Sequence, residues 1–451
     1  MNTSGVYLSV WLVLTSNRTR KRASSRANRH NRRKQQRRQG VLTSSCVSKS
    51  WRAASLRHLF PTAKFSSSDD FTRWCDIGSC LPQVPLYVKE VVFEPEVKPI
   101  RSLRDAFLDV EDETSLQTRF EALERFVVQN PGMTSNPSGF QLPGMPRVHK
   151  LVWKTSLSLS VPITCTPETR QFISTFCSLK EIKLSGSFVT VSDAKEFLGL
   201  LPRIEVLDIK AIDIDEAGSS GQSPVFAGDM TKLRKLSVEE CEISLDWLVD
   251  DILAMSCPTQ LQSIRYEHDL PFSLTTFTRL VTLSSESLQE LIIQPPDRTT
   301  PGGWQIPPHF TNKSFPSLTS LTFCIIQLGL PHNPPLFSMN WCRRVIEVLP
   351  PALKMTSLTM HFYAVRHEHT HEIVADQSFD WKQLSERISK LFPQLKKFVI
   401  HISMETDFGV RQKALSEALL KERLEHFGDK LVIEWVDENP HLRSVIDWDS
   451  E

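Results

Sequence analysis

Leu179-Lys180-Glu181-Ile182-Lys183-Leu184 is the stretch that decides the fold of this chain, because its pattern returns in the same phase along the sequence. The pattern is an apolar residue, two variable residues, an apolar residue, one variable residue and an apolar residue. Its other clear copies are Ile204–Ile209, Leu233–Val238, Leu261–Tyr266, Leu288–Ile293 and Leu318–Phe323. Self-similarity at a fixed period is typical of solenoids, in which each repeat stacks on the next. We therefore expect a solenoid, and we expect it to bind a partner rather than to catalyse a reaction.

Weaker copies extend the pattern in both directions. They are Tyr87–Phe93, Leu123–Val128, Val148–Trp153, Met355–Met360 and Leu395–Ile400, followed by a strand-like run at Leu431–Trp435. Between Leu123 and Leu318 the copies are 25 to 31 residues apart. Because leucine-rich repeats have periods of about 20 to 29 residues, the spacing predicts this α/β class with some insertions. Parallel strands should line the concave side and helices the convex side.

Each copy is expected to be a strand, because alternation points its apolar residues inward and the residues between them outward. The outward residue in the middle of each copy belongs to the candidate substrate-binding face. These residues are Lys183, Asp208, Ser237, Arg265, Ile292, Thr322, Thr359 and Val399. Their mixed chemistry identifies no ligand, and an outward strand residue is solvated by default.

The segments between the copies carry helix signals. Thr166 and Pro167 offer a hydroxyl N-cap and a proline at the first helical position. Asp193 and Glu196 are spaced as a capping pair, and Pro202 should end that helix. Further helices are expected at Asp246–Met255, Trp341–Leu349 and Asp380–Leu391. Strand-helix alternation also fits an ordinary doubly wound α/β domain. Such a sheet does not require the recurring six-residue pattern, each copy of which is called a phrase below.

Charge is distributed unevenly along the 451 residues. The formal charge is +1, with 53 Lys and Arg against 52 Asp and Glu. Residues 18–38 hold 11 of the basic residues and residues 1–68 contain no acidic one, so 42 basic residues face 52 acidic ones over the rest of the chain. The body is therefore acidic, and a basic arm at residues 1–40 is expected to be disordered.

The basic arm is a candidate nuclear-import signal. The residues concerned are Arg20, Lys21, Arg22, Arg32, Arg33, Lys34, Arg37 and Arg38. A solvated tail without a role is the alternative. Aromatic residues, on which bases stack, are not interleaved with the charges, so nucleic acid is not an expected partner.

Cysteines and apolar runs indicate a cytoplasmic or nuclear protein. The cysteine number, nine, is odd, and residues such as Cys177, Cys241 and Cys324 lie in apolar runs, where a thiol packs as a small hydrophobic group. The longest apolar run, Val6–Leu14, is shorter than the roughly 18 residues of a membrane span. Its positive charges follow it, whereas those of a signal peptide precede the apolar run.

Residues 41–60, VLTSSCVSKSWRAASLRHLF, form an amphipathic segment whose apolar stripe includes Ala54. The segment resembles the second half of an F-box, with its Val-Ser-Lys-x-Trp stretch and closing Leu-Phe pair. Together with the repeats it resembles fungal F-box/leucine-rich-repeat proteins over roughly residues 41–436. By that resemblance, adaptor-binding residues would be Val47, Trp51, Leu56, Leu59 and Phe60.

The resemblance implies a non-enzymatic receptor whose F-box binds the adaptor subunit of a cullin-based ubiquitin ligase of the SCF type. Its repeats would capture a protein substrate. The first half of the F-box is missing, and its place is taken by the basic tract ending at Gly40. Either an alternative first exon leaves half an F-box, or residues 41–60 are a capping helix and the protein is an interaction scaffold without a ligase link. The expected domain divisions are the basic arm at 1–40, the partial F-box-like segment and a linker at 41–80, the solenoid at 81–440 and an acidic tail at 441–451.

Signals for chemistry are sparse. His367, His369 and His371 alternate as zinc ligands on a strand would, but they follow a strand and are interpreted as an exposed loop. Cys75 and Cys80 have no second pair of suitable spacing for zinc. No nucleophile-elbow, phosphate-loop, kinase or dinucleotide motif occurs. We expect no catalytic residue, metal or cofactor, with an enzyme built on the histidines as a third hypothesis.

Overall fold

The computed structural model describes residues 55–66, 68–94, 144–155, 163, 165, 167–201, 203–214, 230–239, 241, 245–254, 260–267, 274–294, 314–326, 335–365, 379–404 and 410–436. The basic arm, Val47, Trp51, the expected copy Leu123–Val128 and the histidine run 367–371 lie outside these described residues. The chain divides into two units, residues 1–61 and 62–451. In the first unit residues 55–59 are helical, with Leu56 buried and Leu59 and Phe60 half-buried.

The second unit is built on a sheet of twelve parallel strands that follow one another in chain order. They are β1 (Thr62–Phe65), β2 (Glu90–Phe93), β3 (Lys150–Lys154), β4 (Glu181–Phe188), β5 (Val206–Ile214), β6 (Lys235–Glu239), β7 (Ser263–Glu267), β8 (Glu290–Ile293), β9 (Ser320–Ile326), β10 (Ser357–Val365), β11 (Lys397–Met404) and β12 (Leu431–Val436). A doubly wound sheet reverses its strand order at a switch point, so that alternative is wrong. The expected α/β architecture with parallel strands is confirmed, and β1 starts the sheet ahead of residue 81.

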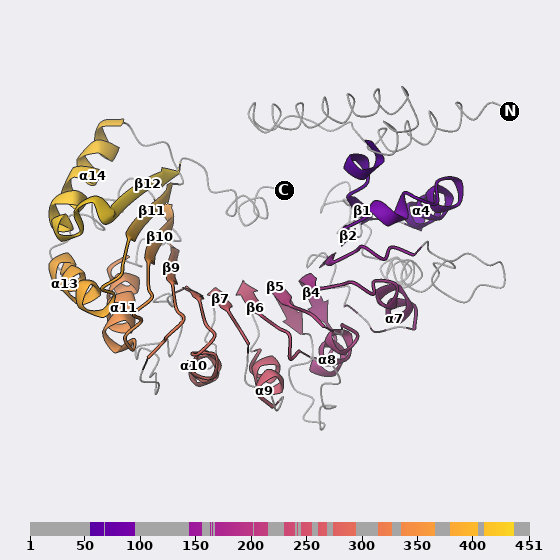
Figure 1. Cartoon of the computed structure of the whole chain (residues 1–451), viewed down its shortest axis with the longest axis horizontal. Helices are drawn as coiled ribbons and strands as arrows, with labels where there is room; N and C mark the ends of the chain where they lie inside the picture. The colour runs from indigo at the N-terminus through magenta and orange to yellow at the C-terminus, as the bar shows by residue number, and fades with distance from the viewer. Residues whose placement is uncertain are drawn as a thin grey trace, which may run out of the picture. The chain divides into compact units, whose positions relative to one another are not determined.

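The helices lie along one face of this sheet, on the outside of its curve (Figure 1). Those placed between successive strands are α7 (Pro167–Ser174), α8 (Val191–Gly199), α9 (Asp246–Ala254), α10 (Leu274–Leu283), α11 (Pro335–Val348) and α13 (Trp381–Leu391). α4 (Ser68–Cys80) and the 3-10 turn η1 (Pro85–Tyr87) connect β1 to β2, and α14 (Val410–Arg423) and η3 (Glu425–Lys430) precede β12. The arrangement is a solenoid-like α/β fold.

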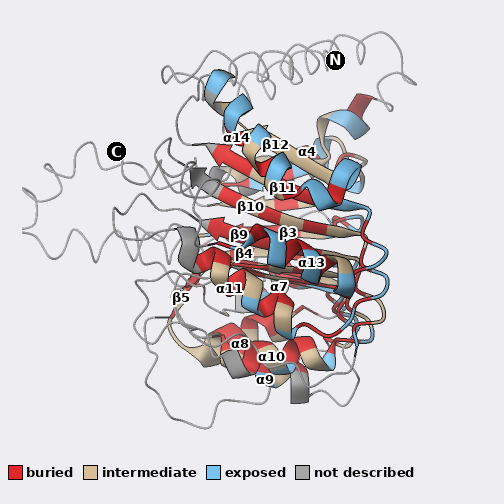
Figure 2. Ribbon diagram, turned by 90° about the vertical axis from the view of Figure 1, so that its left-hand side faces the viewer, coloured by how far each residue is buried: buried red, intermediate tan, exposed pale blue. Residues whose placement is uncertain are grey.

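Two rows of inward side chains form the core between the sheet and the helices. Alternation on the strands, repeated in register, places one apolar residue of every strand in each row. The first row runs through Ala63, Val91, Leu151, Ile182, Leu207, Leu236, Ile264, Leu291, Leu321, Leu358 and Phe398, each at most 3% exposed. Buried residues concentrate on the strands and on parts of α8, α10 and α11, whereas α14 carries more exposed residues (Figure 2). Burial of one such aliphatic side chain contributes about 1.5–3 kcal/mol.

A tight turn precedes many of the strands, three residues ahead of each phrase. In it a buried residue accepts, through its carbonyl oxygen, a hydrogen bond from the backbone N–H of the first phrase residue. The pairs are Met145 with Val148, Phe176 with Leu179, Met230 with Leu233, Phe315 with Leu318, Ala352 with Met355 and Phe392 with Leu395, at 2.9–3.4 Å. Proline at the second turn position, as in Pro146, Pro316 and Pro393, favours this turn. The repeating unit therefore begins three residues before the phrase.

A ladder of shared carbonyl groups ties each turn to the next. The carbonyl oxygen of Lys180 accepts from the N–H groups of both Glu205 and Val206, at 2.8 and 3.0 Å. The same bond pair recurs at His149, Glu205, Arg234, Gln262, Gln289, Thr319 and Thr356. Because the acceptor is always the second phrase residue, the ladder fixes the strand register from repeat to repeat.

Helix starts differ in part from those expected. α8 begins with a capping box in which Thr190 is the N-cap and Asp193 the third helical residue, at 3.1 Å in each direction. The expected pairing of Asp193 with Glu196 is therefore wrong, and Glu196 instead forms an ion pair with Arg170. Pro167 does begin α7, and Asp380 caps α13 by accepting from the Gln383 N–H at 2.8 Å. α11 begins at Pro335, ahead of the expected Trp341.

The described cysteines are free thiols. Cys241 and Cys324 are buried as expected, at 1% and 2% exposure. Cys177 is exposed, because it lies in the turn between α7 and β4 rather than on a strand. Of the helices that the structure describes, none has the length and apolarity to cross a bilayer.

Candidate interaction surface on the open face of the sheet

The face of the sheet opposite α7–α13 is called here the open face, and the predicted recognition residues lie on it in one row. Lys183, Asp208, Ser237, Arg265, Ile292, Thr322, Thr359 and Val399 oppose one another on successive strands. Parallel strands lie about 4.8 Å apart, so each of these side chains neighbours the next. We call this set the middle row. Seven of its members are partly exposed, and Val399 is buried at 5% exposure.

Two further outward rows flank the middle row. One lies two residues toward the strand starts and includes Glu90, Lys150, Glu181, Lys235, Ser263, Glu290, Ser320, Ser357 and Lys397. The other lies two residues toward the strand ends and includes Lys154, Ser185, Lys210, Glu239, Cys324, His361, His401 and Glu434. Only the middle row contains the recognition residues predicted from the sequence.

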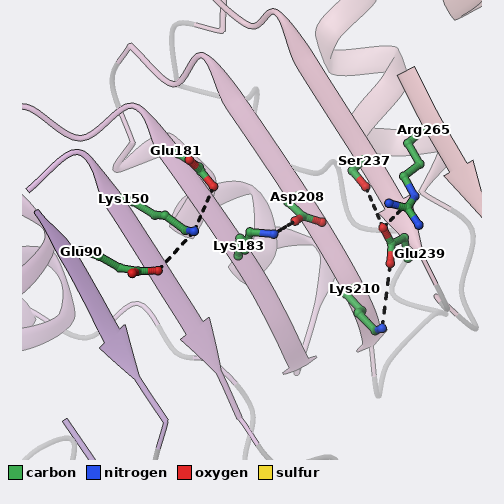
Figure 3. Close-up of polar contacts among 9 residues, drawn as sticks. All are labelled: Glu90, Lys150, Glu181, Lys183, Asp208, Lys210, Ser237, Glu239 and Arg265. Atoms are coloured by element: carbon green, nitrogen blue, oxygen red, sulfur yellow. Dashed lines mark hydrogen bonds and ion pairs between the residues drawn. The ribbon is translucent and has the colours of Figure 1, made fainter. Parts of the chain in front are cut away.

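On strands β2 to β7 the three rows form a charged half, with ion pairs between neighbouring strands (Figure 3). Lys150 Nζ lies 3.2 Å from Glu90 Oε1 and 3.5 Å from Glu181 Oε1. Lys183 Nζ donates to Asp208 Oδ2 at 2.5 Å, within the middle row. Each partly exposed pair contributes about 0–1 kcal/mol to stability. Their main effect is therefore to neutralise one another on this surface.

Glu239 is the most connected acid of the charged half. Its carboxylate accepts from Arg265 Nε at 2.9 Å and from Ser237 Oγ at 3.2 Å, and Lys210 Nζ lies 3.9 Å away (Figure 3). Only 13% of its side chain is exposed. Glu239 thus joins the middle row to the row at the strand ends.

Lys150 shows the electrostatic effect of such pairing. Burial alone would lower the pKa of its ammonium group, but the hydrogen bond to Glu90 and the charges of Glu181 and Glu90 raise that pKa above its usual value. The group stays fully charged at neutral pH. Pairing with Glu90 and Glu181 therefore holds Lys150 in its charged form.

Strands β8 to β11 are called here the neutral half, because their middle row is uncharged and the charges of Glu290 and Lys397 lie in the row toward the strand starts, on the first and last of these strands. Their middle row is Ile292, Thr322, Thr359 and Val399, which carries aliphatic and hydroxyl groups and no charge. Ser320 and Ser357 add two more neutral positions toward the strand starts. At one border Glu290 accepts from Ser263 Oγ at 2.7 Å. Removing water from neutral side chains costs less than removing it from ion pairs.

A histidine pair borders the neutral half at its strand ends. The rings of His361 and His401 lie 4.0 Å apart between centroids, at 48° to each other. His361 Nε2 is 3.0 Å from Ser403 Oγ, and His401 Nδ1 is 3.4 Å from Glu434 Oε2. Burial lowers the pKa of His401, although Glu434 acts in the opposite direction. His401 is therefore mostly neutral at pH 7.

Sequence reasoning missed this pair, although a signal existed. Cys324, His361, His401 and Glu434 oppose one another in register, and the first three lie one residue beyond the ends of the phrases that precede them. Continuing the alternation by one step would have placed them on the open face. Among the residues that the structure describes, no group of three or more histidine, cysteine or acidic side chains is placed to hold a metal ion.

The other predicted site residues are only partly described. Leu56, Leu59 and Phe60 lie in or directly after the helical stretch 55–59, and Leu56 is buried. Val47, Trp51, the eight basic import residues and the three histidines at 367, 369 and 371 lie outside the described residues. Comparison of the sequence with protein-family models gives no match, and comparison with curated proteins gives none. The function therefore has to follow from the chemistry of the open face.

Proposed function

We propose that this protein is a non-enzymatic receptor whose open face binds another protein. The observation that carries the proposal is the middle row, in which eight predicted recognition residues oppose one another across eight strands. Solenoids use such continuous strand faces as extended binding surfaces. The outward residues vary in chemistry while the inward ones stay apolar. The chemistry of the open face can therefore change from strand to strand without disturbing the core.

The dimensions of the open face suit a protein partner. Eleven steps of about 4.8 Å give the twelve strands a width of about 53 Å. Three outward rows cover about 13 Å along the strands, at about 6.6 Å for every second residue. The product, about 700 Å², is close to the roughly 800 Å² that one partner contributes to a standard interface.

The two halves of this face suit different parts of one interface. Burial of neutral hydroxyl and aliphatic groups on β8–β11 costs little desolvation, so we expect most of the affinity there. Paired charges on β2–β7 have to be matched by the partner or lose their hydration, so we expect them to set its orientation.

The test compares arginine substitutions on opposite faces of the sheet. Thr322→Arg and Thr359→Arg place a bulky charge in the neutral half, and Glu386→Arg places the same side chain at an exposed position of helix α13. Each protein would be used to capture and cross-link partners, with thermal unfolding as the check on folding. We expect specific proteins to be lost with both open-face variants and kept with Glu386→Arg. Partners that are insensitive to both threonine substitutions would contradict the proposal.

We further propose the ligase role implied by the F-box/leucine-rich-repeat resemblance, in which residues 41–60 bind the adaptor subunit of a cullin-based ubiquitin ligase. The support is the amphipathic sequence and the burial of Leu56. Co-purification with the adaptor should succeed and should be lost in Trp51→Ala. Failure of the wild-type chain to bind, or binding that ignores this substitution, would leave the scaffold without a ligase link as the better description.

A further inference from the structure

Positive charge is concentrated on the turns that lead into β2 to β6. The six residues that end on the first residue of each of these strands are 85–90, 145–150, 176–181, 201–206 and 230–235. Together these segments contain eight lysines and arginines and three acids, whereas the chain beyond residue 38 holds 42 basic against 52 acidic residues. We call the five segments the basic edge.

The corresponding segments before β7, β8 and β9 differ in charge. They are 258–263, 285–290 and 315–320, and their sequences contain no lysine or arginine, only the acids Glu286 and Glu290. Positive charge returns before β10 and β11 with Lys354, Lys396 and Lys397. The charge of the basic edge is therefore a local feature and not a requirement of the repeat.

The three acids of the basic edge are bound within it. Lys150 Nζ lies 3.2 Å from Glu90 Oε1 and 3.5 Å from Glu181 Oε1 (Figure 3). Lys180 Nζ lies 2.7 Å from Glu205 Oε1. The other six cations form no ion pair with an acid of this edge, and all are exposed: Lys89, Arg147, Arg203, Lys232, Arg234 and Lys235.

Glu205 shows how these cations act on an anion. The hydrogen bond and the charge of Lys180 lower the pKa of its carboxyl below the usual value, although desolvation acts against them. The charges of Arg234 and Lys232 act in the same direction as Lys180. Cations from the turns before β4 and β6 thus stabilise a carboxylate on the turn between them, and they would act in the same way on a carboxylate from outside.

We propose that the basic edge binds an acidic segment of a partner protein. Four steps of about 4.8 Å between neighbouring strands give the five turns a length of about 19 Å, which an extended segment of about six residues spans at about 3.3 Å per residue. Recognition of acidic motifs by clustered basic side chains is a recurrent mode of peptide binding. Lys232 and Arg234 lie outside the three rows of the open face, so this surface is additional to the one proposed above.

Two features favour a short protein segment over a nucleic acid. A long polyanion would extend from the basic edge onto turns without lysine or arginine and onto an acidic body. Bases also stack on aromatic side chains. Among its phenylalanine, tyrosine and tryptophan residues the edge has Phe176, which is buried, and Tyr87, which is half-buried at one end.

Charge reversal tests the proposal with the full chain. The probe is a fluorescein-labelled ten-residue peptide of alternating glutamate and serine, and its affinity is measured by fluorescence anisotropy at low salt. Lys232→Glu combined with Arg234→Glu should weaken binding at least about 4-fold, since two attractions become repulsions. Lys382→Glu combined with Lys390→Glu is the matched control, because it changes the net charge equally at exposed positions of α13 and should weaken binding about 2-fold or less.

Further measurements separate the alternatives. Glutamine at positions 232 and 234 should weaken binding less than glutamate does, and thermal unfolding checks that each variant is folded. Binding of the wild-type chain should fall near 0.5 M salt, where charges are strongly screened. Equal losses in the edge variant and the α13 variant, or no loss in the edge variant, would overturn the proposal.

Two other occupants of the basic edge would also overturn the proposal. A ten-nucleotide thymidine strand that binds more tightly than the peptide, with the same dependence on Lys232 and Arg234, would identify the surface as a nucleic-acid site. Residues 437–451 contain five acids and one arginine. If the peptide binds only after their removal, the chain's own acidic segment is the occupant.

Discussion

The charged half and the neutral half of the open face are built on the same backbone but satisfy their outward side chains differently. Lys183 and Asp208, on neighbouring strands of the charged half, bind each other, whereas Thr322 and Thr359 occupy the same row without charge. Both halves have the same inward rows and the same carbonyl ladder. The difference shows that the fold is set by one face of each strand, while the other face is free to vary in chemistry.

The largest expected effect is common to both halves. Leu207→Ala and Leu321→Ala remove fully buried residues of the same inward row, one in each half. Each should lower the free energy of unfolding by about 2–5 kcal/mol, through lost burial and a residual cavity. Denaturant unfolding measures both. A loss below about 1 kcal/mol for either variant would mean that the two halves do not share one core.

The next effect should separate the halves. Glu239→Ala removes a nearly buried acceptor from Arg265, Ser237 and Lys210, and should cost about 1–3 kcal/mol. Thr359→Ala, in the neutral half, should change stability by about 0.5 kcal/mol or less. Chemical denaturation of the two variants against wild type checks the difference. Equal losses would show that the neutral half depends on an outward network as well.

A smaller effect concerns the partly exposed pair Lys183–Asp208. A double-mutant cycle with Lys183→Ala and Asp208→Ala should give a coupling energy of about 0.2–1 kcal/mol at low salt. The coupling should shrink toward zero near 1 M salt, where the Debye length is about 3 Å. Persistence of the full coupling at high salt would mean that the pair is shielded from solvent.

The smallest effect is a pH dependence at the edge of the neutral half. The pKa of His401 is lowered from 6.5 by burial, so the unfolded chain takes up a proton at higher pH than the folded protein. Stability from this group is therefore present above pH 6.5 and is lost as the pH falls below 6.5, down to the folded pKa. His401→Asn should remove that part of the loss, measured as unfolding curves at pH 7.5, 6.5 and 5.5. An unchanged pH profile would contradict the assignment.

The fold and the middle row could be predicted because alternation and phase act together. Alternation assigned Thr322 and Thr359 to the outward face, and the repeated phase assigned them to opposite positions on their strands. Helix caps were harder to predict from the sequence, since Thr190 with Asp193 and Asp193 with Glu196 are both spaced as capping pairs. Because β4 ends at Phe188, the helix can begin directly afterwards with Thr190 as its N-cap. The phrase alone does not show where β4 ends.

Contacts made by residues outside the phrases could not be predicted from the sequence as readily. β1 contains no phrase, and its place in the sheet depends on pairing with β2. His361 and His401 are forty positions apart in the sequence and meet because β10 and β11 both continue past their phrases. The adaptor binding proposed for residues 41–60 would depend on a partner, so no property of the folded chain alone predicts it.

The chain-order pairing of the twelve strands also sets how the protein responds to force. Among the strands that the structure describes, each is hydrogen-bonded to the strands that directly precede and follow it in the sequence, and β1 is not paired with β12. Tension applied to the two ends would therefore peel terminal strands first and extend the solenoid repeat by repeat. A protein of this kind yields gradually under load instead of rupturing at one step, and it can re-form from whatever repeats remain paired.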